Sequence, residues 1–264
     1  MSPQHPQDTS MTTPNPIALI TGGSRGLGRS TALKLAEHGA DIIITYHRNR
    51  TEAEAVLAQI HASGRRAAAL QLDAAEVASF DGFAAQVRAL LQDRFGAERF
   101  DYLINNAGFG EDASIAEATE AQFDRLMNVH LKGVLFLTQR LLPLIADGGR
   151  IINISSGLTR FTFPGKAVYA AMKGAVEVLS RYLAKELGPR RIAVNTVAPG
   201  AVATDFGGGA VRDNPQINQA VASLTALGRV GLPQDIGGAI AHLLSPESGW
   251  INGQRIEISG GMNL

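Results

Sequence analysis

The sequence predicts an α/β fold: a single domain with a doubly wound parallel sheet of about seven strands and helices on both faces. Two observations predict it. Short apolar runs, typical of strands buried on both faces, alternate along the chain with longer amphipathic segments typical of helices. In addition, no linker-like stretch or internal repeat interrupts this alternation after residue 15. The 264 residues therefore fit one domain whose strands are joined by right-handed crossovers.

The overall composition argues against several classes of function. Lys plus Arg and Asp plus Glu both number 24, so no net charge attracts nucleic acid or an anionic membrane. The absence of cysteine excludes disulfides and thiol catalysis, and it fits a reducing cytoplasm, where we expect the protein to reside. The six histidines show no paired spacing on a helix, so no metal site is expected. No apolar run reaches the roughly 18 residues of a membrane span.

Residues 1–15 form a distinct N-terminal segment. They are rich in Pro, Ser, Thr and Gln, and they lack the apolar core of a signal peptide. Because this segment has too little apolar content to pack, we expect a disordered leader followed by a folded domain over 16–264.

The first element of the domain is a strand that runs into a glycine-rich stretch. Ile17–Ile20 is continuously apolar and leads directly into Thr21–Gly28, after which a helical pattern covers Ser30–His38. Strand, glycine loop and helix in this order aim backbone N–H groups and a helix N-terminus at a phosphate, whereas a glycine triplet alone also fits a plain turn. We therefore predict the diphosphate site of a dinucleotide at Gly22, Ser24, Arg25, Gly26, Leu27 and Gly28.

The end of the second strand, Asp41–Thr45, is where such a fold reads the adenosine ribose. The usual acidic partner of a 2′-hydroxyl is absent, and a Tyr-His-Arg-Asn-Arg segment follows instead. Arg48, next to His47 and assisted by Arg25 in the glycine loop, suits a 2′-phosphate and predicts NADP(H) as the cofactor. The alternative is that Arg48 and Arg50 only solvate a loop.

Two more strand ends supply candidate cofactor contacts. The third strand, 67–72, ends before Asp73 and Ala74, where the carboxylate could accept a hydrogen bond from an adenine amino group or cap the following helix. The fourth strand, 100–104, is followed by Asn-Asn-Ala-Gly, a turn that would let a cofactor lie against the backbone or could be a simple Asx turn. The candidates from this turn are Asn105, Ala107 and Gly108.

Apolar periodicity and turn residues predict the remaining elements. A helix over 51–63 begins with a capping-box pattern formed by Thr51 and Glu54. Residues 204–223 show little regular pattern and resemble a hinged substrate lid, with disorder as the alternative. The other elements are helices over 79–95, 120–142, 169–187 and 233–244 and strands over 150–154, 192–197 and 254–259.

The residues that carry chemistry lie after the fifth strand. Tyr169 and Lys173 are four residues apart on a predicted helix, so both side chains project from one face. An ammonium beside a phenol favours the phenolate and lowers its pKa from about 10, which permits acid/base catalysis near neutral pH. Ser156 could hold a carbonyl oxygen through its hydroxyl. The Tyr-x-x-x-Lys pattern alone also fits a packed tyrosine and a surface lysine.

Together these motifs resemble the short-chain dehydrogenase/reductase family, in its single-domain Rossmann type and close to 3-oxoacyl-(acyl carrier protein) reductase-like members, from Ile17 to about Gly261. Each motif is modest alone, but six in the right order are very specific. They are Thr21-Gly-x-x-x-Gly-x-Gly28, Asp73, Asn105-Asn-Ala-Gly108, Ser156, Tyr169-x-x-x-Lys173 and Pro199-Gly200 with Thr204.

The resemblance implies roles for individual residues. Tyr169 would be the general acid/base, and Ser156 would polarise the substrate carbonyl. Lys173 would bind the nicotinamide ribose and lower the pKa of Tyr169. The nicotinamide would lie near Pro199, Gly200, Val202 and Thr204. The resemblance also implies a homotetramer, or a homodimer, packed through the helices over 120–142 and 169–187.

One position departs from the family pattern. The family's fourth catalytic residue, an Asn in the long helix, falls on His130. Asn128 lies two residues earlier, a rotation of about 200° on a helix, so it would face away unless the helix were re-registered. His130 is therefore expected to take the role, linking a water chain to Lys173 and charging near pH 6.5. The alternative is a packed histidine without a proton role.

The sequence thus predicts an NADP(H)-dependent oxidoreductase that moves hydride between the nicotinamide and a carbonyl or secondary alcohol carbon of a small molecule. The alternative is a dinucleotide-binding regulatory or scaffolding protein on the same fold. The substrate stays open among acyl thioesters, ketones and sugars, because specificity lies in segments 109–112, 158–163 and 204–223, where no motif helps.

Overall fold

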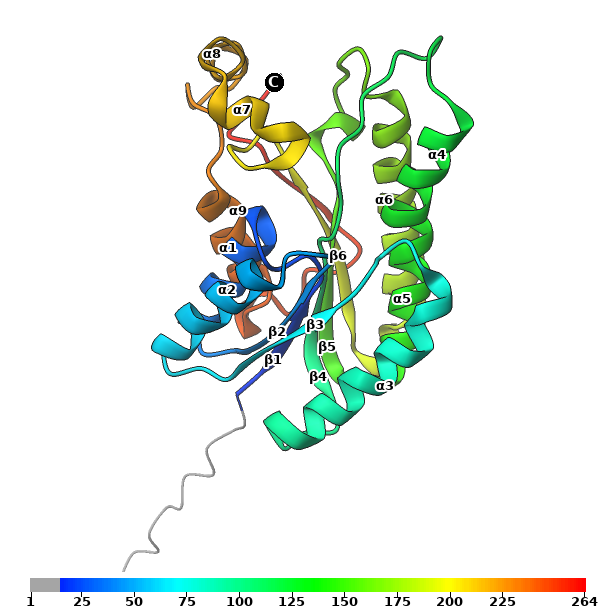
Figure 1. Cartoon of the computed structure of the whole chain (residues 1–264), viewed down its shortest axis with the longest axis vertical. Coiled ribbons are helices and arrows are strands. Elements are labelled where there is room, and N and C mark those ends of the chain that lie inside the picture. The colour runs from blue at the N-terminus through cyan, green and yellow to red at the C-terminus, as the bar shows by residue number, and fades with distance from the viewer. Residues whose placement is uncertain (1–14) are drawn as a thin grey trace, which may run out of the picture.

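The computed structural model describes residues 15–264, so the expected leader over 1–15 lies outside the described residues except for Asn15. A parallel sheet in the order β3-β2-β1-β4-β5-β6-β7 forms the centre of the domain, with helices on both sides (Figure 1). The predicted fold class is confirmed. The strands are β1 (Ile17–Ile20), β2 (Asp41–Tyr46), β3 (Ala67–Gln71), β4 (Phe100–Asn105), β5 (Ile145–Ile154), β6 (Ala193–Pro199) and β7 (Arg255–Ile258).

Two hydrophobic cores fill the space between the sheet and its helical layers. In β1, Leu19 packs into the core beneath α3, α5 and α6, whereas Ile20 packs into the core beneath α1 and α9, as strand alternation requires. Within residues 15–264, no helix is both long and apolar enough to cross a membrane. The helices named here are α1 (Gly26–Glu37), α2 (Arg50–Ala62) and α9 (Pro233–Leu243) on one face and α3 (Phe80–Leu90), α5 (Gly133–Leu141) and α6 (Ala167–Glu186) on the other, with α4 (Glu120–Met127) beside α6.

The strand order creates a crevice at the carboxyl ends of the strands. β1 pairs with β2 on one side and with β4 on the other, so the chain reverses its direction of travel across the sheet at this point. The connections after β1 and β4 diverge to opposite faces and leave an opening, which is where open α/β sheets bind ligands. The predicted cofactor segments after β1, β2, β3, β4 and β6 all follow strand ends at this edge, whereas Tyr169 and Lys173 lie on α6.

The start of α2 differs from the prediction. Asn49 caps this helix, because its side chain accepts a hydrogen bond from the Glu52 N–H at 3.1 Å, so the assignment of Thr51 as the cap is wrong. Glu54 completes no capping box and instead pairs with Arg50 Nε at 2.7 Å. Asparagine is at least as good an N-cap as threonine, and it comes two residues earlier.

The long helix predicted over 120–142 is interrupted. A π-helical turn over Asn128–Lys132 separates α4 from α5. Such a turn inserts a residue into the helical register and is frequent at functional sites. Gly133 lets α5 approach the chain after β3 closely, since a Cβ there would overlap the carbonyl oxygen of Ala74. The turn points His130 into the interior, where it is 1% exposed.

Most of the segment predicted to be irregular over 204–223 is helical, which corrects that prediction. α7 (Ala210–Asp213) and α8 (Pro215–Ser223) stand above the carboxyl ends of the strands (Figure 1). Asn214 caps α8 by accepting hydrogen bonds from two N–H groups of its first turn, and Pro215 takes the first helical position. The Asn-Pro pair therefore starts a helix rather than breaking the chain.

A chain of buried polar side chains ties one helical layer to the sheet. Asn105 at the end of β4 donates to Thr138 of α5 at 3.0 Å and to Asn153 of β5 at 2.8 Å. Asn153 donates in turn to Ser180 of α6 at 2.8 Å. All four side chains are buried, so a lost bond would leave a polar group unpaired in the core. The chain therefore sets how α6, which carries the predicted acid/base pair, lies against β5.

Candidate active site

The glycine loop forms an open anion site. α1 begins at Gly26 rather than at the predicted Ser30, so its first turn belongs to the loop. Its N-cap, Arg25, makes no side-chain capping bond, and the first turn carries no acidic residue. The N–H groups of this first turn, which includes Leu27 and follows Ser24 and Arg25, are therefore available to a phosphate. These features fit the diphosphate of a dinucleotide.

Thr21 and Asn106 hold the glycine loop against the end of β4. The Thr21 hydroxyl accepts hydrogen bonds from the N–H groups of Asn106 and Ala107, both at 2.9 Å. The Asn106 amide donates to the carbonyl oxygens of Thr21 and Gly22 at 2.9 and 3.1 Å. A Cβ on Gly28 would overlap the Gly22 carbonyl oxygen, so only glycine permits this approach. The sequence interpretation missed the roles of Thr21 and Asn106.

The turn after β4 divides between the core and the crevice. The Asn105 side chain is 5% exposed and bonds within the core, so it does not face the predicted cofactor site. Gly108, in contrast, is exposed. Alternation along the strand could have revealed this difference, because Asn105 and Asn106 must point to opposite faces. Only the backbone of Asn105 is left for contact with a cofactor.

The adenosine end of the crevice is basic. Within residues 15–264, the exposed side chains of Arg25 and Arg48 form no ion pair or hydrogen bond, whereas Arg50 is held by Glu54. His47 Nε2 lies 3.3 Å from the carboxylate of Asp73, and both side chains are about half exposed. Two unpaired guanidinium groups at this edge fit a 2′-phosphate.

The end of β6 closes the other side of the crevice. β6 ends at Pro199, and a Cβ on Gly200 would lie 2.9 Å from the Cα of Ser259 in the segment after β7. Val202 forms an isolated bridge with Gly231. Thr204 comes within 3.7 Å of the position that a Cβ on Gly26 would take, so the β6 end and the glycine loop face one another.

Ser156, Tyr169 and Lys173 converge beside this crevice. Tyr169 and Lys173 lie one turn apart on α6 and are 8% and 4% exposed. The Lys173 ammonium donates a hydrogen bond to the carbonyl oxygen of Ile154 at 2.8 Å and lies 5.6 Å from the centroid of the Tyr169 ring. Ser156 follows the end of β5 by two residues, and its Oγ accepts from the Leu158 N–H at 3.2 Å.

Burial dominates the proton equilibria of this group. Desolvation raises the pKa of Tyr169, and the Ser156 hydroxyl counteracts that rise only in part. Desolvation also lowers the pKa of Lys173 to about 7. The expected lowering of the Tyr169 pKa by Lys173 is therefore not met in this structure, because burial of the phenolate is the largest effect and only the Ser156 hydroxyl opposes it.

His130 occupies the interior position that was expected of it. Its Nε2 donates to the carbonyl oxygen of Phe109 at 2.7 Å, and its ring stands edge-on to Tyr169 with the centroids 5.2 Å apart. Burial, and then the charge of Lys173, lower its pKa to about 3, although the Phe109 carbonyl acts in the opposite direction. The prediction that His130 charges near pH 6.5 is therefore wrong. Nδ1 has no hydrogen-bond partner in the described part of the chain.

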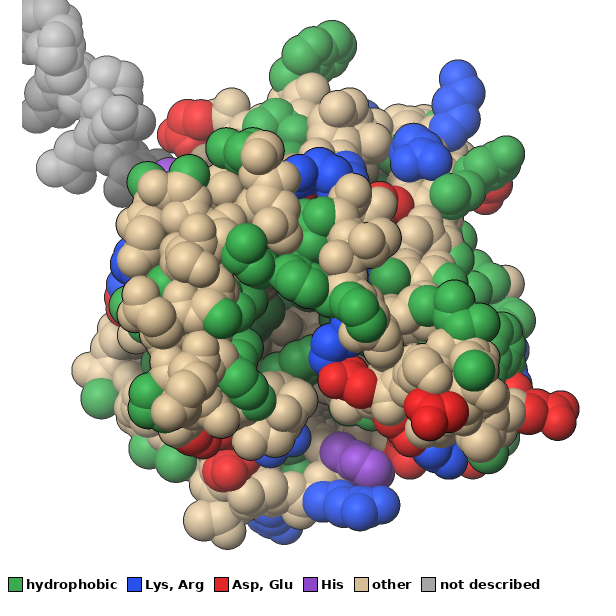
Figure 2. Space-filling model, turned by 90° about the horizontal axis from the view of Figure 1, so that it is seen from above, with side chains coloured by type: hydrophobic (Ala, Val, Ile, Leu, Met, Phe, Trp, Pro, Cys, Tyr) green, Lys and Arg blue, Asp and Glu red, His purple; other side chains and the backbone are tan. Residues whose placement is uncertain are grey.

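Phenylalanine side chains lie beside Tyr169, beside His130 and in the loop after Ser156. The ring of Phe206, which precedes α7, lies 5.7 Å from the Tyr169 ring, and that of Phe109 lies 5.5 Å from His130. Phe161 and Phe163 form a T-shaped pair in the loop after Ser156. Viewed from above, this end of the molecule is hollowed, and hydrophobic side chains lie around the hollow (Figure 2). Aromatic side chains thus adjoin Tyr169 and His130.

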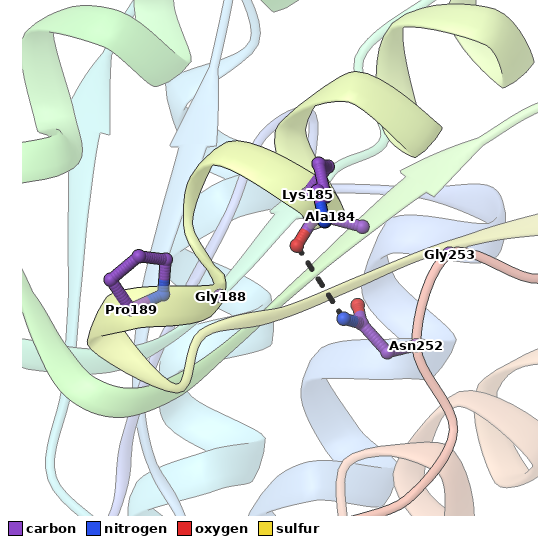
Figure 3. A pocket seen from close by; sticks show the side chains of 6 residues that line it. All are labelled: Ala184, Lys185, Gly188, Pro189, Asn252 and Gly253. Atoms are coloured by element: carbon purple, nitrogen blue, oxygen red, sulfur yellow. Dashed lines mark hydrogen bonds between the residues drawn. The ribbon is translucent and has the colours of Figure 1, made fainter.

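A second depression lies far from these residues and carries no comparable chemistry. It is found at the C-terminal end of α6, about 16 Å along the helix from Lys173. There the Asn252 side chain donates to the carbonyl oxygen of Ala184 at 3.5 Å (Figure 3). Lys185 is its only ionisable lining side chain among the described residues, so no acid/base pair is available.

The chain matches known proteins along most of its length. A family model described as enoyl-(acyl carrier protein) reductase matches residues 22–263. A hydroxynaphthalene reductase-like protein from Metarhizium brunneum is 34% identical over 269 aligned residues, which cover 97% of each chain.

Solved structures agree with this match. An angucycline C-6 ketoreductase with bound NADP is 37% identical, covers 94% of this chain and 95% of its own, and superimposes with a TM-score of 0.89. A short-chain dehydrogenase from Burkholderia cenocepacia in complex with NADP is also 37% identical, with coverages of 95% and 98% and a TM-score of 0.86. Because the family model and these relatives extend over nearly the whole domain, the chain belongs to the short-chain dehydrogenase/reductase family, oxidoreductases that act on carbonyl and alcohol groups.

Proposed function

We propose that this protein is an NADPH-dependent ketoreductase that converts the ketone of a bulky aromatic substrate into a secondary alcohol. The observation that carries the proposal is the convergence of Ser156, Tyr169 and Lys173 beside the glycine loop, with phenylalanine rings adjoining them. The folded unit over 16–264 would serve as the catalytic domain.

The residues along the crevice fit NADP(H), which would supply hydride to the carbonyl carbon. The free N–H groups at the start of α1 would bind the diphosphate, and Arg25 with Arg48 would bind the 2′-phosphate. Asp73 would accept from the adenine, and Lys173 would bind the nicotinamide ribose. Support comes from two relatives whose structures contain NADP.

Tyr169 would supply the proton. Because burial raises its pKa, the phenol is protonated at neutral pH and can donate to the oxygen that gains charge as hydride reaches the carbon. The Ser156 hydroxyl would donate a hydrogen bond to the same oxygen and so stabilise the developing charge. The proton moves from the tyrosine oxygen to the substrate oxygen, and the positive charge of Lys173 would stabilise the tyrosinate that is left.

The aromatic surroundings of Tyr169 favour a planar apolar substrate. Phe206 lies on one side of Tyr169, and Phe109 packs against His130 nearby. Aromatic rings pack favourably against one another beyond the area that they bury. The hydroxynaphthalene reductase-like relative and the ketoreductase relative carry names that agree with a ketone on a fused-ring substrate.

Assembly belongs to the same proposal. Phe123 of α4 and Val178 and Tyr182 of α6 are large apolar side chains that are 43%, 45% and 66% exposed. A partner subunit packed on these helices would cover them, which supports the expected homotetramer or homodimer. The absence of cysteine from the sequence supports the expected cytoplasmic location.

The substrate class can be tested with purified protein and NADPH. We expect a fused-ring ketone such as 1-tetralone to be reduced with a kcat/KM at least about tenfold above that of acetone, because apolar burial adds roughly 0.8 kcal/mol per CH₂ group. An acetoacetyl thioester serves as the comparison for the acyl class. A higher kcat/KM with the thioester than with every aromatic ketone would contradict the substrate assignment.

Cofactor preference should depend on the unpaired arginine after β2. Arg48→Ala is expected to lower the preference for NADPH over NADH by about ten- to a hundredfold, because a charge-assisted contact with the 2′-phosphate is lost. Arg50→Ala is the matched control, since Arg50 pairs with Glu54. The measurement is kcat/KM with each cofactor. Equal preference in wild type and Arg48→Ala would remove Arg48 from the phosphate site.

Removal of the phenolic hydroxyl should separate catalysis from binding. Tyr169→Phe is expected to lower kcat by at least about a thousandfold, within the range for general acid catalysis, while the Kd for NADPH changes little. Tyr182→Phe on the same helix, with a 66% exposed side chain, controls for the substitution itself. The measurements are steady-state turnover and a fluorescence titration with NADPH. Turnover within tenfold of wild type would exclude Tyr169 as the acid.

His130 should not contribute to the pH dependence of kcat near neutral pH. With a pKa lowered to about 3, its ring stays neutral from pH 5 to pH 8. We therefore expect kcat against pH to have the same shape in wild type and His130→Asn, and an inflection near pH 7 shared by both would point to Lys173. An acid-side fall between pH 6 and 7 that is present in wild type and absent from His130→Asn would show that His130 does become charged.

A further inference from the structure

Four charged side chains form a ladder behind the catalytic serine. Arg160, Glu257, Arg255 and Glu177 alternate in sign, and their side chains are between 12% and 37% exposed. Arg160 grips both carboxylate oxygens of Glu257 at 2.6 and 2.8 Å. Arg255 joins the two acids, with Nη1 at 3.0 Å from Glu257 and Nε at 2.8 Å from Glu177. The ladder therefore links β7, α6 and the loop after Ser156.

The inner half of this ladder contacts the backbone and neighbours of Ser156. Arg255 Nη2 donates to the carbonyl oxygen of Ser156 at 3.3 Å. Glu177 accepts hydrogen bonds from the hydroxyls of Ser155 and Thr159, both at 2.7 Å. Arg255 also donates to the Thr159 hydroxyl at 3.0 Å. The Ser156 backbone and its neighbours Ser155 and Thr159 are thus all held by Arg255 and Glu177.

The outer half anchors the ladder to the C-terminal segment. Arg160 donates to the carbonyl oxygens of Met262 and Asn263 at 2.7 and 2.9 Å. Asn263 N–H donates to the Leu224 carbonyl oxygen at 2.9 Å, immediately after α8. Met262 is 2% exposed, so this segment is packed into the fold. The ladder consequently has fixed supports at both ends.

We infer that Arg255 is a positioning residue for the Ser156 hydroxyl, acting through the Ser156 carbonyl and through Glu177 and Thr159. Because it concerns the carbonyl-binding role of Ser156, the inference rests on the proposed function. In this role Arg255 does not contact the substrate or the cofactor. The Ser156 Oγ accepts the Leu158 N–H, so its hydroxyl proton can be donated to an oxygen in the site, either that of Tyr169 or that of a substrate.

The ladder suits this task because its charges have little freedom. Shielded ion pairs with additional hydrogen bonds hold their geometry, whereas removal of one partner leaves an uncompensated charge. Arg255 and Glu257 both lie on the edge strand β7, from which they reach Glu177 of α6 and Arg160 of the loop after Ser156. A hydroxyl displaced by about 1 Å can cost about a hundredfold in rate, because hydrogen bonds to a reacting oxygen depend steeply on distance.

The decisive experiment is a double-mutant cycle between Arg255→Met and Ser156→Ala, with single-turnover rates measured at high enzyme concentration. We expect Arg255→Met alone to lower kcat by about ten- to a hundredfold, while the ketone KM and the NADPH Kd stay within about twofold. In the Ser156→Ala background the same substitution should change the rate by less than about threefold, because the group that it positions is gone.

Two further variants keep the test decisive. Thr159→Val removes one hydroxyl from the inner half without leaving a charge unpaired. If Arg255→Met does not fold, Thr159→Val takes its place in the cycle, and its effect on the rate should likewise depend on the presence of Ser156. Arg190→Met is the control: Arg190 also pairs with a carboxylate, Asp147 at 2.8 Å, but binds the carbonyl oxygens of Leu142 and Ile145 at the other end of the sheet. It should leave kcat unchanged.

Either of two results would overturn the inference. One is an unchanged kcat in Arg255→Met; the other is an equal loss of rate in the wild-type and Ser156→Ala backgrounds, which would indicate general loosening. Failure of the proposed function would look different, because either the wild-type protein would reduce no ketone with NADPH, or Ser156→Ala and Tyr169→Phe would retain the full wild-type rate.

Discussion

The hydrogen bond from the Lys173 ammonium to the Ile154 carbonyl oxygen is the contact on which the arrangement of the site depends. It joins α6 to the end of β5, two elements that meet only in the folded protein. Ser156 follows Ile154 by two residues, and Tyr169 precedes Lys173 by one helical turn, so this contact, together with the bond between Asn153 and Ser180, sets where the Ser156 hydroxyl lies relative to the Tyr169 phenol. Because the ammonium is buried, its pKa falls to about 7, and the carbonyl is its one hydrogen-bond partner among the described residues.

Desolvation sets the proton equilibria of the whole centre. The same burial keeps Tyr169 protonated, makes Lys173 easier to deprotonate and holds His130 neutral. These are three consequences of one cause, since a low dielectric disfavours whichever form of a group is charged. His130 is therefore better described as a neutral side chain that fixes the Phe109 carbonyl than as a group that gains and loses a charge.

Two polar networks support the end of β5 from different sides. The buried chain through Asn105, Asn153 and Ser180 lies between the sheet and the helical layer of α5 and α6. The ladder through Arg255 and Glu177 approaches from the edge strand. Polar networks that are fully satisfied restrict the geometry of a core more than apolar contacts do, because any shift breaks directional bonds. Ser156, which follows the end of β5, therefore has few positions available to it.

The sequence by itself determined the seven strands, the glycine loop and the order of the motifs. These features are local: strand periodicity, glycine spacing and helix spacing can each be read within about 20 residues. Even the choice between Asn105 and Asn106 was within reach of the sequence, because strand alternation separates their directions.

The tertiary structure alone decided the rest. A π-helical turn at His130 inserts one residue without leaving a sequence signal, and the helix start at Gly26 depends on how the loop meets Asn106 and Thr204. The pKa values could not be anticipated, because they follow from burial that many distant segments create together. The ladder joins Arg255 to Glu177 across 78 residues of sequence, a separation at which no periodic pattern operates. Charge pairing of this kind exists only once the sheet has brought its edge strand beside α6.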